Sequence, residues 1–276
     1  MDIKENPKDY KDLKMAVNLL ESPTITARIS NLIGSPIEGA VKSLPASVSK
    51  KIHGAVKTAL HKSASAALWS LENKPKKGAS TIIHKLYAAS SGAIGGAFGF
   101  TALFLELPVS TTIMMRSVAD IARSEGFDLD DFSTKQACIE VFAMGGNTTK
   151  DDATETGYYI TRGFSTEAML YLSKELSELA AKQGTKMASR FTPAQTATWL
   201  ATLIEKVAAR FGVVITNKFA AQAIPVIGAV TGATINTLFT DFYQGIARGH
   251  FTVKRLEEKY GYEHIKSEYK RIVNGQ

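Results

Sequence analysis

The sequence contains a single cysteine, Cys138, among its 276 residues. One cysteine cannot form an internal disulfide, which excludes a disulfide-stapled fold and fits a reducing compartment. The five histidines are scattered along the chain, so no metal-ligand spacing appears and we expect no metal site. The short motifs of common hydrolases, nucleotide-binding folds and redox proteins are also missing, so we expect no cofactor.

No stretch of useful length alternates apolar and polar residues, and no repeat of fixed period is present. Apolar residues recur instead at three- and four-residue spacing, which is the period of an amphipathic helix. We therefore predict an all-α protein. We expect one multi-helix domain over residues 23–265, preceded by a loose N-terminal segment at 1–22 and followed by a C-terminal tail at 266–276.

Charge is missing from two long stretches, Leu86–Leu105 and Phe219–Thr240. Both are long enough to cross a bilayer, but their glycines and polar residues favour a buried helical hairpin instead. The glycines repeat at i, i+4 spacing, which allows two helix backbones to approach closely. We expect the two glycine-rich helices to pack on each other and to organise the domain. The predicted helix-packing residues are Gly92, Gly95, Gly96, Gly99, Gly228 and Gly232.

A polar residue ends each glycine face, Glu106 in the first and Asn236 in the second. Because Pro108 disfavours helical geometry at the residue before it, we expect one helix at 84–106 and another at 108–124, stopped by Gly126. Buried polar groups need partners. These residues predict either a polar pin that fixes two helices or a functional pocket. The candidate pocket residues are Glu106, Arg116, Asp120, Asn236 and Tyr243; alternatively, Arg116 and Asp120 form an i, i+4 pair on a solvated face.

Positive charge is concentrated in residues 41–86, where nine lysines and one glutamate give a net charge of +8, against +7 for the whole chain. Within this segment, Val48–Leu71 predicts an amphipathic helix whose lysines lie off the apolar stripe. Two interpretations stay open: a core-packing helix with a solvated lysine face, or a helix that binds an anionic membrane surface. The candidate membrane-surface residues are Lys50, Lys51, Lys57 and Lys62. The segment has no arginine and little aromatic character, so we expect no nucleic-acid partner.

Two groups of residues resemble the EcsC family of bacterial proteins. The first comprises Leu105-Glu106-Leu107-Pro108 with Thr111, Thr112 and Arg116; the second comprises Ala223-Ile224-Pro225, Gly228, Gly232, Asn236, Phe239, Tyr243 and Phe251. The resemblance covers roughly residues 25–260. It implies a bacterial protein that is cytoplasmic or peripheral to the membrane, and an accessory role beside a membrane transporter. It implies no catalytic residue.

Three functions are compatible with these patterns. The first is a non-enzymatic peripheral membrane or lipid-binding protein, with an anionic membrane surface and a membrane protein as expected partners. The second is a soluble adaptor that binds another protein. The third is an enzyme of unknown reaction that uses Glu106, Arg116 and Asp120. The lysine segment and the missing motifs favour the first two. The first twenty residues are too charged for a signal peptide, so we expect a cytoplasmic protein at the inner face of the cell membrane.

Overall fold

The computed structural model describes residues 2–34, 37–68, 79, 82–85, 87, 99–145, 157–163, 193–222 and 228–275. All regular secondary structure in these residues is helical, which confirms the all-α class. The elements are η1 Ile3–Glu5, α1 Pro7–Leu20, α2 Ile25–Ile33, α3 Glu38–Lys42, α4 Ala46–Leu68, α6 Gly99–Ser124, α7 Phe132–Glu140, η2 Val141–Gly145, α9 Pro193–Gln222, α10 Gly228–Tyr260 and α11 Tyr262–Val273. Residues 82–85 and 157–163 are also helical.

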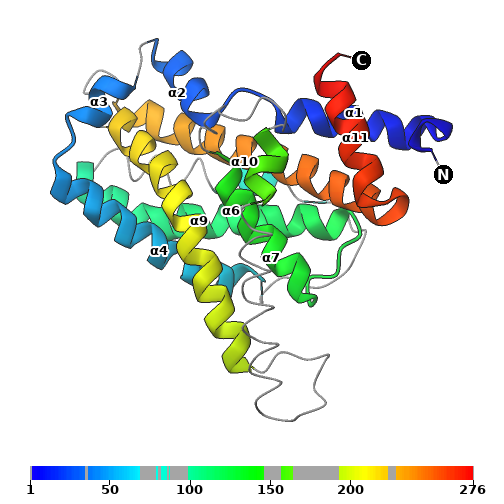
Figure 1. Cartoon of the computed structure of the whole chain (residues 1–276). Coiled ribbons are helices and arrows are strands. Elements are labelled where there is room, and N and C mark those ends of the chain that lie inside the picture. The colour runs from blue at the N-terminus through cyan, green and yellow to red at the C-terminus, as the bar shows by residue number, and fades with distance from the viewer. Residues whose placement is uncertain are drawn as a thin grey trace.

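The longest of these helices, α10, lies in the middle of the molecule (Figure 1). It contacts α1, α6, α9 and α11, so segments from both ends of the chain meet on one helix. Its inward side chains Ile235, Phe239, Phe251 and Leu256 are fully or almost fully buried. Burial of this kind, at roughly 1.5–3 kcal/mol for each large apolar side chain, drives the assembly of the helices around α10.

Helix α4 packs its apolar face against α6 and α9. Ile52, Val56 and Leu60 are completely buried on that face, and the Ser63 and Thr112 hydroxyls meet across the α4–α6 contact at 3.1 Å. The amphipathic helix that the sequence predicts therefore exists, and its apolar stripe belongs to the protein core. Its lysines lie on the exposed side of the helix.

Pro108 does not divide α6, and the prediction of two helices meeting there is wrong. The helix is continuous from Gly99 to Ser124 with the proline inside it. Proline removes one backbone donor and normally disfavours a helix interior. Here the helix is held along its length by packing against α4 and α10, and the Thr112 hydroxyl donates to the Pro108 carbonyl at 2.7 Å. Tertiary packing thus overrides the local preference.

The helix ends where the sequence predicts. Gly126 adopts a positive φ of 101°, a conformation that favours glycine. Its N–H donates to the carbonyl of Arg123 at 3.1 Å, and the N–H of Phe127 donates to the carbonyl of Ala122 at 3.1 Å. This pair of bonds is the Schellman arrangement, which satisfies carbonyls at a helix C-terminus. The turned chain then places the Phe127 ring against Phe251 of α10.

The two chain ends are ordered helices, so the expectations of a loose segment at 1–22 and a tail at 266–276 are wrong. Ile3, Leu13 and Tyr269 are completely buried. The Tyr269 hydroxyl of α11 donates to Glu21 at 2.8 Å, just after α1, and both ends lie on the same side of the molecule (Figure 1). In both terminal helices a few buried apolar residues are separated by many charged ones. Composition alone therefore gives no clear indication that these segments are helical.

Tight packing against a glycine occurs in the described residues at Gly145, Gly212 and Gly249. A Cβ at Gly249 would lie 2.7 Å from Leu20 Cγ, a Cβ at Gly212 would lie 2.5 Å from His53 Nδ1, and one at Gly145 would collide with the Tyr243 hydroxyl. Without a side chain, Gly249 of α10 can pack against α1, Gly212 of α9 can pack against His53 of α4, and Gly145 can pack against the Tyr243 ring. Gly92, Gly95 and Gly96 lie outside the described residues, and the surroundings of Gly99, Gly228 and Gly232 are likewise outside what the structure describes. The predicted contact between the two glycine faces therefore stays a prediction.

Candidate functional site

A buried ion pair joins three helices around Glu106. Glu106 Oε1 of α6 accepts hydrogen bonds from Lys218 Nζ of α9 at 2.8 Å and from Asn236 Nδ2 of α10 at 2.7 Å. The Glu106 and Lys218 side chains are each only 3% exposed. The buried carboxylate that the sequence predicts therefore has an ammonium and an amide as partners. Removing one member of such a pair leaves a costly uncompensated charge.

The other predicted pocket residues lie elsewhere. Because α6 is continuous, Asp120 is fourteen residues beyond Glu106 on the same helix, which is about 21 Å along the axis. Asp120 pairs with Arg123, and Nε2 of His84 lies 3.5 Å from its Oδ2. Arg116 supplies neither of these contacts. The expected single pocket is therefore not formed, and only Glu106 and Asn236 of the five residues meet.

Tyr243, the fifth predicted residue, belongs to the aromatic core. Its ring stacks on Phe142 with centroids 5.1 Å apart and an interplanar angle of 20°, and it meets Phe211 and Phe242 edge-on. Burial raises the pKa of its hydroxyl well above the usual value. A tyrosine enclosed in this way positions helices and is not available for acid–base chemistry.

A second buried polar cluster, absent from the sequence predictions, lies at the C-terminal part of α10. Glu257 Oε1 accepts from Arg162 Nη1 at 2.7 Å and from the Tyr159 hydroxyl at 3.0 Å. The Tyr158 hydroxyl lies 3.0 Å from Nδ1 of His250. Burial, with the nearby charges of Arg162 and Lys254, lowers the pKa of His250 well below its ordinary value of 6.5. The signal available in the sequence was the seven-residue spacing of His250 and Glu257, which puts both on one face of a helix.

The exposed lysines of α4 form a separate cationic surface, which we call the α4 lysine face and define as Lys50, Lys51, Lys57 and Lys62. All four are exposed. Lys57 pairs with Glu205 of α9, and both partners are substantially solvated. Among the described residues the other three have no ion-pair partner, so their charge is available to an external anionic surface.

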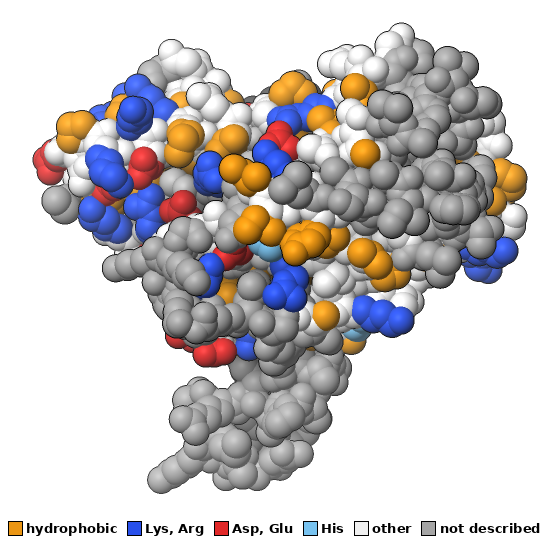
Figure 2. All heavy atoms as spheres, turned by 180° about the vertical axis from the view of Figure 1, so that it is seen from behind, with side chains coloured by type: hydrophobic (Ala, Val, Ile, Leu, Met, Phe, Trp, Pro, Cys, Tyr) orange, Lys and Arg blue, Asp and Glu red, His pale blue; other side chains and the backbone are white. Residues whose placement is uncertain are grey.

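Exposed apolar side chains gather around the helical residues 82–85. Ile82, Ile83 and Tyr87 are 73%, 52% and 62% exposed. Figure 2 shows hydrophobic side chains near the middle of one face of the molecule, with Lys and Arg side chains beside them. Large apolar side chains exposed this close together are uncommon on a solvent-facing surface and indicate a contact site.

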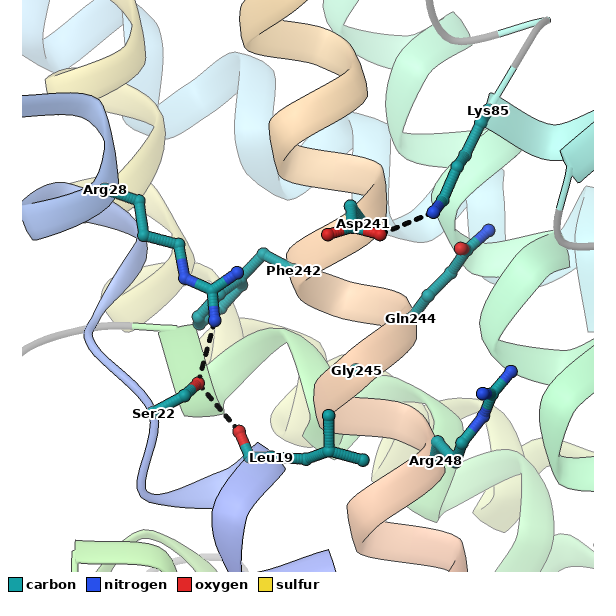
Figure 3. A pocket seen from close by; sticks show the side chains of 9 residues that line it. All are labelled: Leu19, Ser22, Arg28, Lys85, Asp241, Phe242, Gln244, Gly245 and Arg248. Carbon is teal, nitrogen blue, oxygen red and sulfur yellow. Dashed lines mark hydrogen bonds and ion pairs between the residues drawn. The ribbon is translucent and has the colours of Figure 1, made fainter. Parts of the chain in front are cut away.

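A hollow of about 260 Å³ lies over α10 beside this segment. In Figure 3, Arg28, Ser22 and Leu19 stand on one side of α10, and Lys85 points in from the other. The remaining lining residues are Asp241, Phe242, Gln244, Gly245 and Arg248, all from α10. Three cations and one carboxylate thus surround a space that no sequence pattern indicated, because its walls come from segments far apart in the chain.

The described residues contain no group of His, Cys, Asp and Glu side chains suited to holding a metal ion. Within the same residues, none of the helices combines the length and the apolar character needed to cross a membrane. The candidate sites of the described chain are therefore its two buried polar clusters, the α4 lysine face and the cationic hollow.

These features define an all-α protein with ion-paired helix contacts and a cationic exterior. A model of the EcsC protein family matches residues 13–256, and the chain belongs to that family. The matched region runs from α1 to the last turns of α10 and includes the buried Glu106–Lys218 ion pair and the hollow. Searches of curated proteins and of solved structures find no match to the chain.

Proposed function

We propose that this protein is a non-enzymatic, peripheral membrane protein that binds anionic lipid surfaces. The observation that carries the proposal is the α4 lysine face, whose side chains project from a helix that the core holds in place. Each lysine close to an anionic bilayer contributes about 1 kcal/mol, and the effect decays within a Debye length. Lys57 is paired with Glu205, so the other three lysines on this rigid helix supply roughly 3 kcal/mol of reversible attraction.

The apolar contribution to membrane binding comes from a segment outside α4. Ile52, Val56 and Leu60 of α4 are buried in the core and do not enter a bilayer. Ile82, Ile83 and Tyr87 are exposed and adjoin Lys85. Exposed apolar side chains of this kind suit the interfacial region of a membrane. Electrostatic attraction by the α4 lysine face and burial of these exposed apolar side chains would together give shallow, reversible attachment to the membrane.

The enzymatic alternative loses support from the geometry. Glu106 is buried and forms an ion pair with Lys218, and Asp120 forms an ion pair with Arg123. A general acid or base must reach a substrate atom to within hydrogen-bond distance. Carboxylates that lie about 21 Å apart on one helix do not share a substrate.

Liposome flotation tests the proposal directly. We expect the protein to float with vesicles containing phosphatidylglycerol at low salt, to float poorly with phosphatidylcholine vesicles, and to dissociate at high salt. The variant with Lys50, Lys51, Lys57 and Lys62 changed to Gln should lose most of the binding, while its circular dichroism spectrum is unchanged.

The matched control removes the same charge from another part of the molecule by changing Lys8, Lys11, Lys14 and Lys270 to Gln. These residues belong to α1 and α11, away from α4 (Figure 1). If the control variant loses as much binding as the α4 variant, net charge and not the α4 lysine face is responsible. Absence of flotation with every vesicle would refute the proposal and favour a protein-binding adaptor.

A further inference from the structure

The hollow over α10 carries an excess of positive charge. Lys85 pairs with Asp241 across one wall, so these two charges largely cancel. Arg28 and Arg248 remain, one from α2 and the other from α10, and both line the same space. Among the described residues, neither arginine has an acidic partner. The hollow therefore has a local charge of about +2, which attracts an anion.

The Arg28 guanidinium is held in a fixed orientation. Its Nη2 donates to the Ser22 hydroxyl at 2.9 Å and its Nε donates to the Pro23 carbonyl at 3.2 Å. The Ser22 hydroxyl in turn donates to the Leu19 carbonyl at 2.8 Å, as Figure 3 shows. The guanidinium carbon also lies 5.1 Å from the centre of the Phe242 ring. Since a guanidinium has five N–H donors and two are bound here, the remaining donors are preorganised for a ligand.

Gly245 of α10 lies in the hollow between Arg28 of α2 and Arg248 of α10, and its lack of a side chain leaves this space open. A Cβ added there would meet only Leu19 Cδ2, at the ordinary contact distance of 3.5 Å, so a longer side chain would project over the helix into the space. Arg248 follows three residues later and is exposed. The hollow therefore has Arg28 on one side of α10 and Arg248 on the other, with Gly245 between them.

The size of the hollow limits its ligand. Its volume of about 260 Å³ is below the roughly 300–1,000 Å³ typical of sites that enclose drug-sized molecules. A single tetrahedral anion with a small substituent fits such a space, and arginine forks match phosphate oxygens well. Sites for acyl chains need a long apolar tunnel, which this hollow does not provide.

We infer that this hollow binds one phosphate ester group, with Arg28 and Arg248 as its cationic partners and the Lys85–Asp241 pair closing one wall. Where the ester is a lipid headgroup, the inference rests on the proposed membrane function. Ile82 and Ile83 belong to the same helical segment as Lys85 and are exposed, so the lipid part would leave the hollow toward an apolar rim.

Isothermal titration calorimetry at low salt tests the inference with three probes: inorganic phosphate, glycerol 3-phosphate, and dihexanoyl phosphatidylglycerol below its micelle concentration. We expect wild-type protein to bind a phosphate ester. Arg248→Gln removes a charge-assisted hydrogen bond and should weaken binding about tenfold. Gly245→Gln fills the hollow and should weaken binding at least as much.

Two control variants should bind within about twofold of wild type, as expected for changes that leave the site's contacts in place. Lys11→Gln removes one exposed charge from α1, outside the hollow. Gly245→Ala leaves most of the hollow open. Thermal melts of all four variants establish that they fold.

The outcomes separate the ligand's source. Tenfold tighter binding of the lipid than of glycerol 3-phosphate identifies a lipid headgroup, and equal binding identifies a soluble phosphate ester. Binding of none of the probes by wild-type protein overturns the inference, as does equal binding by Arg248→Gln, Gly245→Gln and wild type. If vesicle flotation succeeds while the titrations fail, the proposed function stands without this site; if flotation fails while the titrations succeed, the site stands without the membrane.

Discussion

Two buried polar clusters are built on the same helix and differ in kind. Near the start of α10, Asn236 joins the Glu106–Lys218 ion pair, in which opposite charges compensate each other. Fourteen residues later, His250 is enclosed beside Tyr158, and the nearby cations Arg162 and Lys254 disfavour its protonated form. The first cluster stabilises the fold through charge. The second depends on one imidazole staying neutral, so it makes the fold sensitive to acid.

The largest effect should come from breaking the first cluster. Glu106→Ala leaves the Lys218 ammonium buried without its counter-charge, and we expect a loss of about 3–5 kcal/mol in the free energy of unfolding. Urea denaturation measures this loss. The double variant Glu106→Gln with Lys218→Met removes the buried charge as well and should recover most of the stability.

The control for that experiment is the exposed pair Lys57–Glu205, whose side chains are 46% and 63% exposed. Glu205→Ala should cost less than about 1 kcal/mol, because solvent screens exposed pairs. If Glu106→Ala and Glu205→Ala lowered the free energy of unfolding equally, burial would not distinguish the Glu106–Lys218 pair from the exposed Lys57–Glu205 pair, and the prediction would be wrong.

Acid should act mainly on the second cluster. Because the pKa of folded His250 lies well below 6.5, the unfolded chain binds a proton first as the pH falls. Stability is therefore lost below about pH 6.5, at up to roughly 1.4 kcal/mol per pH unit. Between pH 7 and pH 5 we expect urea denaturation to show a loss of stability, and His250→Gln should remove that part of the slope. An identical slope in His250→Gln and in the exposed-site control His53→Gln would rule out His250 as the source.

The smallest effect should come from a single hydroxyl of the second cluster. Tyr159→Phe deletes the hydrogen bond to Glu257, whose Oε1 still accepts from Arg162. We expect a loss of about 1 kcal/mol, the usual value for one hydrogen bond whose partner stays satisfied. Thermal and urea denaturation check this value. Tyr87→Phe, at an exposed tyrosine, should change stability by less than about 0.5 kcal/mol.

The first cluster was partly visible in the sequence, and the second was not. Glu106 stands out because it is the first charge after twenty uncharged residues, so its burial could be inferred. The identity of its cation could not: Arg116 is nearer in sequence, but Lys218 is more than one hundred residues away and reaches it from α9. Tyr158, Arg162 and Glu257 occur in segments with ordinary polar composition, and only the packing of residues 157–163 on α10 makes them a cluster.

Helix periodicity, the absence of strand patterns and the glycine at position 126 were enough to predict an all-α protein, the amphipathic character of α4 and the end of α6, because these features depend on neighbours within a few turns. The partners of Glu106, the continuity of α6 through Pro108 and the hollow between Arg28 and Arg248 required the assembled structure. Each depends on how helices distant in sequence are placed against one another, and the free energy of that packing outweighs local preferences such as the helix-breaking tendency of proline.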